Sequence, residues 1–228
     1  LVNLDDPEIV KRCAELPCRR VTFSLDQPAD VCVKQDQVWL FDQPLFALSD
    51  LHLPGRHNLQ NAMVAAAMAV KLGVDADQIR EGIRTFKGVE HRIEFVAEIN
   101  GARYYNDSKG TNVDATTVAL KAFDKPVILL AGGYDKKTGF DGLKPVLDRV
   151  ATMIVYGETR DQLKALRPDA IVVETMAEAV DQACQLAKKG DIVLLSPVCA
   201  SWDQFTDYEQ RGRQFKEQVL ALARQAGE

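Results

Sequence analysis

The amino-acid sequence predicts an α/β fold whose main part is a doubly wound, mostly parallel sheet. From residue 112 onward, runs of apolar residues alternate with segments of helical periodicity; the runs are "PVILLAG", "TMIVYG", "AIVVE" and "DIVLLSP". Continuous apolar strands are typical of parallel sheets covered by helices on both faces. "RIEFVAEINGARYYND" adds a hairpin, because Asn-Gly between two strand-like runs is a strong hairpin signal. Helices are expected near residues 112–123, 140–150, 159–166, 176–188 and 203–225.

The first part of the chain has a different pattern. Between residues 20 and 47, the runs "VTFSL", "VCVK" and "VWLF" are separated by proline and Asp/Gln turns, which predicts an antiparallel β meander. After Pro54-Gly55, a helix is expected over residues 58–72, because apolar side chains recur at helical spacing (Leu59, Ala62, Met63, Ala66 and Val70). A second helix follows over residues 77–86, and Lys87-Gly88 is the expected linker.

The composition favours a cytoplasmic globular protein, which we expect to be a monomer. The chain has 228 residues, of which 46% are hydrophobic and 27% charged, and a net charge of -5. That charge argues against nucleic acid and anionic membranes as partners. The five cysteines show neither CxxC spacing nor the density of a disulfide scaffold, so we expect reduced thiols.

Three polar clusters follow predicted strands, where ligands of a doubly wound sheet bind. They are "NDSKGTN" after the hairpin, "GGYDKKTG" after "PVILLA" and "SPVCASWDQF" after "DIVLL". The direction of the chain places at least the last two on the same edge of the sheet. Their convergence is better evidence for a site than any single cluster.

Each cluster also has a structural explanation. Asn112 is a candidate N-cap for the following helix, and Ser201 with Gln204 has the spacing of a capping box for the last helix. Lys136 and Lys137 are compatible with a solvated loop. Trp202 and Tyr208 would belong to the core by default, as most aromatic residues do.

Two further segments leave alternatives open. In "GRHNLQNA", Asn58 and Asn61 lie on one face of the expected helix, and Asn58 is also a candidate cap. In "EHRIE", Arg92 suits either an ion pair with Glu90 or Glu94, or a phosphate at a domain junction. Periodicity does not choose between these readings.

Several established motifs are absent from the sequence. It contains no GxxxxGK[ST], GxGxxG or GxSxG, and no zinc-ligand spacing. "GGYDKKT" departs from the phosphate-binding loop because Lys136 stands where its second glycine belongs. The residues by themselves therefore indicate an α/β domain that binds a small anionic ligand.

The sequence resembles the Mur ligases, ATP-dependent amino acid ligases of peptidoglycan synthesis. "GRHNLQNA", "EHRIE", "NDSKGTN", "GGYDKKTGFD" and "SPVCASWDQFTDYEQRGRQF" occur in the order of that family. The "NDSKGTN" and "SPVCASWDQF" forms look like the member that adds D-glutamate to UDP-N-acetylmuramoyl-L-alanine through an acyl phosphate. The DNPR-type signature of the diamino-acid-adding member is missing. The resemblance implies ATP and Mg²⁺ as cofactors, and these two small molecules as substrates.

The resemblance also implies roles for individual residues. Asn58 and Asn61 match ATP-contacting asparagines, Asp107 matches the acid that holds the ribose, and Arg92 matches the arginine that reaches the ATP phosphates. Residues around the incoming glutamate are matched by Lys109, Thr111, Lys136 (or its neighbour Lys137), Ser201, Trp202 and Tyr208. Arg92 and Lys109 are the expected catalytic residues. Position 208 is commonly Phe in the family, so a main-chain contact is expected there.

The family has a UDP-binding domain, a central ATPase domain and a C-terminal Rossmann-like domain. By that pattern, residues 1–88 are the tail of the central domain, and residues 89–228 are the C-terminal domain that binds the amino acid. We expect the chain to be part of a longer protein that carries the phosphate-binding loop and the magnesium ligands, and to lack turnover alone. The alternatives are a folylpolyglutamate synthase-like L-glutamate ligase and a non-catalytic binding module.

Overall fold

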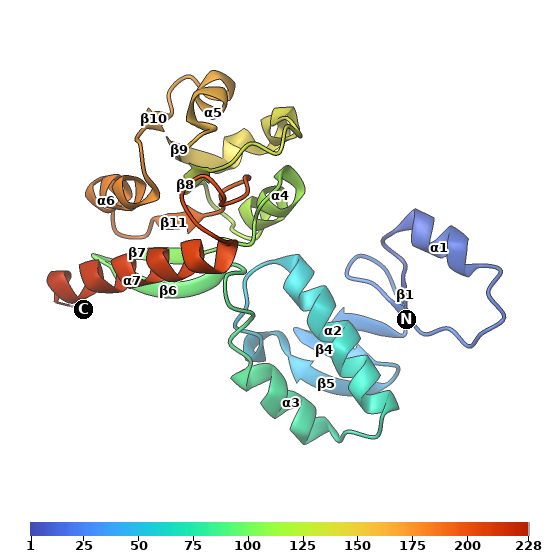
Figure 1. Cartoon of the computed structure of the whole chain (residues 1–228). Coiled ribbons are helices and arrows are strands. Elements are labelled where there is room, and N and C mark those ends of the chain that lie inside the picture. Colours follow the sequence, from blue (N-terminus) through green and yellow to red (C-terminus); the bar gives the residue numbers. More distant parts are fainter. Residues whose placement is uncertain (228) are drawn as a thin grey trace. The chain divides into compact units, whose positions relative to one another are not determined.

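The computed structural model describes residues 1–227, which divide into two compact units, residues 1–87 and residues from Gly88 onward (Figure 1). Each unit has its own sheet and its own hydrophobic core. None of the helices in this described part of the chain is long and apolar enough to cross a lipid bilayer.

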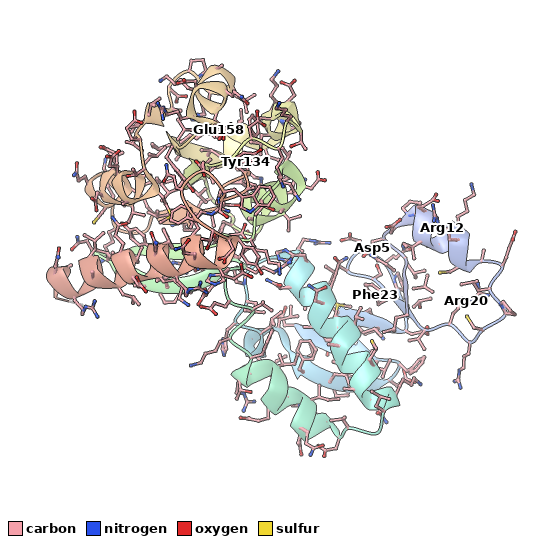
Figure 2. The ribbon with its side chains drawn as sticks, viewed as in Figure 1. Asp5, Arg12, Arg20, Phe23, Tyr134 and Glu158 are labelled. Carbon is pink, nitrogen blue, oxygen red and sulfur yellow. The ribbon has the colours of Figure 1, made fainter. Side chains whose placement is uncertain are left out.

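The first unit is a small sheet with two helices packed on it. Its elements are β1 (Val2–Asn3), α1 (Pro7–Cys13), β2 (Thr22–Phe23), β3 (Val31–Lys34), β4 (Gln37–Leu40), β5 (Gln43–Ala47), η1 (Leu48–Asp50), α2 (Arg56–Lys71) and α3 (Ala76–Thr85). The sheet order is β1-β2-β3-β4-β5. Phe23, labelled in Figure 2, belongs to a core to which α2 contributes Ala62 and Met63 and α3 contributes Ile79. The apolar stripe expected on the first helix is therefore the face that it buries.

The predicted antiparallel meander is correct for β3, β4 and β5 and wrong for β2. β2 pairs in parallel with both β1 and β3. The segment between β2 and β3 is a wide loop, in which the Asp30 carboxylate accepts hydrogen bonds from Thr22 N and Thr22 Oγ1 at 2.8 and 2.9 Å. This loop returns the chain so that β3 starts beside β2 and runs in the same direction, which a tight hairpin turn would not allow.

The second unit contains the predicted doubly wound sheet. Its elements are β6 (Glu94–Ile99), β7 (Ala102–Asn106), α4 (Val113–Lys121), β8 (Val127–Gly132), η2 (Asp141–Arg149), β9 (Val150–Tyr156), α5 (Arg160–Leu166), β10 (Ile171–Val172), α6 (Met176–Leu186), β11 (Ile192–Leu195) and α7 (Tyr208–Ala226). The six strands have the order β10-β9-β8-β11-β7-β6, and all neighbours are parallel except β6 and β7.

Two separate cores cover the two faces of this sheet, which explains the continuous apolar runs. Along β8, Val127 and Leu129 point into the core shared with α4 and η2, whereas Ile128 and Leu130 point into the core shared with α6 and α7. Figure 1 shows α4 and α6 on opposite sides of the strands, and α7 shares its core with α6. Because both faces are buried, neither set of alternate positions can be polar.

Two of the predicted helices differ in the structure. The segment expected near residues 140–150 is a 3₁₀ helix, η2, with Pro145 inside it. Proline lacks the N–H that a continuous α-helix needs at that position. The last helix begins at Tyr208, five residues later than expected, because the polar segment before it forms turns at the end of β11.

Candidate functional site

Three loops meet at the carboxyl ends of the neighbouring strands β7, β11 and β8. They are residues 107–112, residues 133–139 and residues 196–207, the three polar clusters expected from the sequence. Backbone hydrogen bonds join them: Val198 N donates to Gly110 O at 2.8 Å, and Tyr134 N donates to Ala200 O at 2.9 Å. The structure thus brings all three clusters together, and we call this edge of the second unit the rim.

A buried arginine lies beneath the rim. Arg211, in the first turn of α7, is 0% exposed. Its Nε donates to Ser108 Oγ at 2.9 Å and its Nη2 to Ser108 O at 2.8 Å, while Nη1 donates to Cys199 O and Ala200 O, both at 3.2 Å. Burial lowers the pKa of this guanidinium from its usual value, and electrostatic interactions with Tyr156, Cys199 and Asp203 oppose that effect.

Sequence reasoning did not select Arg211 as a functional residue, although a signal was present. The residue stands four positions before Phe215 and eight before Val219, on the stripe of α7 that faces the core. An arginine in phase with apolar residues indicates a buried cation with its own acceptors. Ser108, which supplies two of those acceptors, was likewise overlooked.

Asp107 faces inward from the first loop and is 4% exposed. Ser196 Oγ donates to its Oδ2 at 2.7 Å, and Ile93 N donates to its Oδ1 at 3.3 Å. Burial raises the pKa of this carboxyl to about 7, although these hydrogen bonds and the charges of Arg92 and Arg211 act in the opposite direction. In this structure both oxygens of Asp107 are therefore engaged by the protein itself.

The raised pKa makes a testable prediction for stability. In the unfolded chain Asp107 ionises near its ordinary pKa, so between about pH 4 and 7 the folded state holds a proton that the unfolded state has released. Stability should therefore fall as pH rises through this window and then level off. Because Asp107→Asn removes the titration, its free energy of unfolding relative to wild type should rise by about 2 kcal/mol from pH 5 to pH 8.

Urea unfolding of both proteins at the two pH values measures this effect. Asp124→Asn is the matched control, since Asp124 is exposed between α4 and β8. A difference between Asp107→Asn and wild type that stays constant with pH would contradict the raised pKa.

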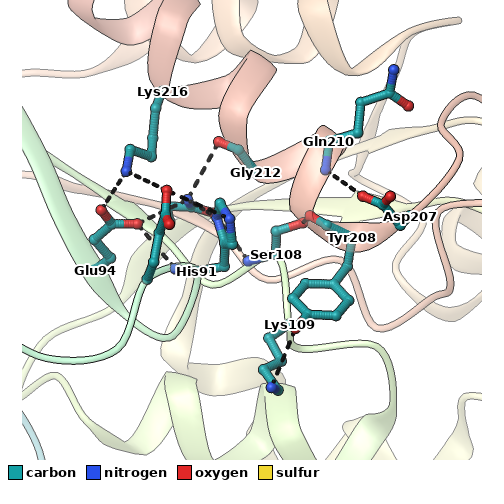
Figure 3. Close-up of polar contacts among 11 residues, drawn as sticks. His91, Glu94, Ser108, Lys109, Asp207, Tyr208, Gln210, Gly212 and Lys216 are labelled. Carbon is teal, nitrogen blue, oxygen red and sulfur yellow. Dashed lines mark hydrogen bonds and ion pairs between the residues drawn. The ribbon is translucent and has the colours of Figure 1, made fainter.

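Lys109 and Tyr208 lie together at the mouth of the first loop. Lys109 Nζ is 3.3 Å from Tyr208 Oη and 5.2 Å from the centre of the ring (Figure 3). The carbonyl oxygen of Tyr208 accepts a hydrogen bond from Ser108 Oγ at 2.7 Å. Lys109 is exposed and Thr111 is partly buried, so an ammonium and a hydroxyl are available on one loop. These groups suit a carboxylate.

The other two loops add further groups to the rim. Lys136 and Lys137 are both exposed, and the side chain of Lys136 makes no hydrogen bond or ion pair within residues 1–227. Trp202 is 63% exposed, so its default assignment to the core is wrong, and its ring lies 5.5 Å from that of Tyr134, labelled in Figure 2. Ser201 is 2% exposed at the start of the same turn.

The predicted capping box of Ser201 and Gln204 is wrong. Asp207 is the N-cap of α7, and its carboxylate accepts from Gln210 N at 2.6 Å (Figure 3). The Gln204 side chain instead accepts from Met176 N at 3.2 Å and donates to Glu174 O at 2.8 Å, which ties the third loop to the start of α6. The N-cap predicted at Asn112 is confirmed, since Asn112 Oδ1 accepts from Ala115 N at 2.8 Å.

Arg92 lies between two residues with left-handed backbone conformations. The φ angles of His91 and Ile93 are 65° and 46°, which is costly for a β-branched residue. The first loop holds this segment, because Lys109 N donates to His91 O at 3.1 Å and Ile93 N donates to Asp107. The Arg92 side chain is exposed and makes no hydrogen bond or ion pair within the described residues. The ion pair with Glu90 or Glu94, one of the two alternatives for Arg92, is therefore not formed.

Those two glutamates pair with a different cation. Lys216 Nζ is 3.0 Å from Glu90 Oε1 and 2.6 Å from Glu94 Oε1 (Figure 3). Buried His91 lies beside them, and its Nδ1 is 2.9 Å from Asn106 Nδ2. Ligand atoms of Glu90, His91 and Glu94 all lie within 4.8 Å of one another, as metal ligands do. The ammonium of Lys216 already pairs with both carboxylates and offsets one of their two negative charges, which disfavours a further cation at this group.

Asn58 and Asn61 belong to the first unit, on the first half of α2. Asn58 is not the cap of this helix: Gly55 holds that position with a φ of 94°, and Asn58 Nδ2 donates to Pro54 O at 2.7 Å. Asn61, one turn later, is exposed. Its amide is thus available to a ligand.

Comparison with known proteins identifies the family to which the chain belongs. Residues 91–199 match the family described as "Mur ligase, glutamate ligase domain", and the chain belongs to the Mur ligase family. The fold agrees: UDP-N-acetylmuramate-alanine ligase of Thermotoga maritima superposes with a TM-score of 0.64 at 18% identity, covering 97% of this chain and 52% of that one.

Individual relatives are closer in sequence. UDP-N-acetylmuramoylalanine–D-glutamate ligase of Caldanaerobacter subterraneus subsp. tengcongensis is 46% identical over 98% of this chain and 52% of its own length. The enzyme of the same name from Shouchella clausii is 41% identical over 96% of this chain and 50% of its own length. The chain thus spans about half the length of the curated relatives it matches.

Proposed function

We propose that the protein containing this chain joins D-glutamate to UDP-N-acetylmuramoyl-L-alanine at the expense of ATP, a step of cytoplasmic peptidoglycan precursor synthesis. The observation that carries the proposal is the similarity to D-glutamate ligases along 98% of the chain. The rim supports it, because lysines and hydroxyl groups from separate loops gather where an amino acid with two carboxylates would bind.

In the proposed reaction, ATP phosphorylates the carboxylate of UDP-N-acetylmuramoyl-L-alanine. The amine of D-glutamate then attacks the acyl phosphate, and the tetrahedral intermediate collapses to an amide with release of phosphate. Fixed cations and donors are needed where negative charge develops. Mg²⁺ would screen phosphate oxygens. Since Lys216 occupies the acidic group near His91, we assign no metal ligand in the described residues.

Residues 89–228 would form the domain that receives the amino acid. Lys109, Thr111, Lys136, Ser201 and Tyr208 would hold D-glutamate, and Trp202 would border it. The exposed ammonium groups of the two lysines provide the positive charge for its carboxylates. Lys109 would also stabilise charge during the attack.

Residues 1–88 would be the tail of the ATP-binding domain. Asn58 and Asn61 would contact ATP, Asn61 near the adenine. Asp107 would hold the ribose and Arg92 the phosphates. The exposed, unpaired guanidinium of Arg92 supports the last role, because its planar fork suits phosphate oxygens. Each oxygen of the Asp107 carboxylate already accepts one hydrogen bond, so a ribose hydroxyl would donate to one of the remaining lone pairs.

Phosphate release tests the proposed function. The full-length gene product containing this sequence would be incubated with ATP, Mg²⁺ and UDP-N-acetylmuramoyl-L-alanine, and with D-glutamate, L-glutamate or a diamino acid in turn. We expect release with D-glutamate only, and none from the 228-residue chain. Turnover with L-glutamate and folate would favour a folylpolyglutamate synthase-like enzyme. Absence of turnover with every amino acid would favour a binding module.

The two neighbouring lysines of the second loop can be separated by mutation. Lys136→Ala should raise KM for D-glutamate by about 10- to 100-fold, the range expected for one charge-assisted hydrogen bond, and leave KM for ATP nearly unchanged. Lys137→Ala is the matched control, because it removes the neighbouring ammonium and leaves the backbone of the loop in place. That backbone has a φ of 58° at Lys137, and its N–H bonds to Asp135 Oδ1 at 2.6 Å. The reverse pattern would move the assignment to Lys137.

A further inference from the structure

Arg211 is buried without an ion pair, and such a charge needs a reason. No carboxylate oxygen of the described residues lies within hydrogen-bond distance of its guanidinium, which instead donates to a hydroxyl and three main-chain carbonyls. Burying a cation is costly unless its donors are satisfied. A leucine or methionine would fill an apolar core position without that cost. The reason for an arginine at this buried position therefore lies in the hydrogen bonds that its guanidinium makes.

Those connections link loops that are far apart in the sequence. Ser108 lies in the loop after β7, directly between Asp107 and Lys109, whereas Cys199 and Ala200 lie in the loop after β11, directly before Ser201. One rigid group thus bonds to the main chain next to two proposed glutamate contacts. A planar guanidinium fixes both distance and angle, which a flexible ammonium does not.

Ser108 connects the loop after β7 to the first turn of α7. Its Oγ accepts from Arg211 Nε at 2.9 Å and donates to Tyr208 O at 2.7 Å, so both of its partners belong to the first turn of α7. The loop after β8 joins the same point, because Tyr134 N donates to Ala200 O and an added Cβ at Gly133 would lie 3.2 Å from Arg211 Nη1. All three rim loops are therefore connected to the first turn of α7 through contacts that meet at Arg211 and Ser108.

We propose that Arg211 and Ser108 form a latch that holds the rim loops in one arrangement and so positions Lys109 and Ser201 for the amino acid. The assignment to the amino acid rests on the proposed function. The latch residues touch neither substrate; they act through the loops. Asp107 has its own anchors in Ser196 and Ile93, so the latch should matter more for the amino acid than for ATP.

Steady-state kinetics of the full-length gene product test the positioning role. The variants are Ser108→Ala, Arg211→Lys and the double variant, with Arg213→Lys as the control because Arg213 is exposed on the same helix. A misplacement of about 1 Å can cost 10²-fold, so we expect kcat/KM for D-glutamate to fall by about 10- to 100-fold in each single variant. KM for ATP should change by less than about threefold, and the double variant should be little worse than either single one, because the residues act as a unit. Equal changes for both substrates, or additive effects, would overturn the proposal.

Hydrogen exchange of the 228-residue chain provides a readout independent of turnover. The amides of Val198 and Tyr134 form the bonds between loops, so their exchange should accelerate together by about tenfold or more in Ser108→Ala and Arg211→Lys. Exchange within β9 and α6 should not change. Faster exchange throughout the second unit would show general destabilisation. Unchanged exchange would show that the bonds between the loops do not depend on Arg211 and Ser108. Either result overturns the latch. If wild type shows no D-glutamate-dependent turnover while the two loops still respond together, the proposed function fails and the latch stands.

Discussion

Gly133→Ala is expected to lower the free energy of unfolding of the second unit by about 3 kcal/mol or more. Gly133 has a φ of 137°, a conformation that residues with a Cβ rarely adopt. An added Cβ would also overlap the carbonyl oxygen of Ala200 and lie 3.1 Å from Cys199 Cβ. These atoms belong to the loop that Arg211 holds by the same carbonyl, so the clash cannot be relieved by rotating a side chain.

Urea unfolding of the chain, followed by circular dichroism, measures this loss. Gly139→Ala is the matched control: its φ of 75° imposes backbone strain, but nothing lies within 4 Å of the added Cβ. We expect the control to lose only about 1 kcal/mol, the strain of a left-handed residue. Equal losses in the two variants would mean that the loops around Gly133 separate easily, which would also argue against a tightly held rim.

Arg92→Ala is expected to reduce kcat of the full-length gene product by about 10²- to 10³-fold, the usual cost of removing one donor that stabilises developing negative charge. The expectation follows from the proposed contact between Arg92 and the ATP phosphates. The stability of the 228-residue chain should not change, because the Arg92 side chain is exposed and makes no hydrogen bond within residues 1–227.

Phosphate release at saturating substrates measures kcat, and thermal unfolding checks stability. Arg103→Ala serves as the control, since Arg103 is an exposed arginine on β7. A normal kcat in Arg92→Ala would remove Arg92 from the proposed phosphate contact. A loss of both stability and activity would instead assign it to holding the strained segment between His91 and Ile93.

The α/β fold could be predicted because burial leaves a direct mark on composition. Strands β8 and β11 are apolar at every position since each face meets its own core. The hairpin was equally readable: Asn100 and Gly101 have φ angles of 52° and 77°, the left-handed pair that an Asn-Gly turn favours. Local chemistry decides such features, so a short window of sequence contains the information.

Features that depend on distant partners could not be predicted in this way. The parallel direction of β2 depends on a loop held by Asp30. The helix α7 starts later than the sequence predicts, because Gln204 bonds to the beginning of α6 rather than to its own helix. In each case a local signal was present and a longer-range hydrogen bond overrode it.

The candidate site shows the same division. The sequence by itself determined which polar clusters follow the strands, because parallel strands deliver their loops to one edge. Only the tertiary structure decided that Asp107 faces inward, that Trp202 faces solvent and that Arg211 is buried beneath three loops. Ser108 and Arg211 are 103 positions apart in the chain, and their contact depends on β11 lying between β7 and β8 in the sheet. Packing of such distant segments sets the burial and the partners of a polar side chain, and these in turn set its charge and its role.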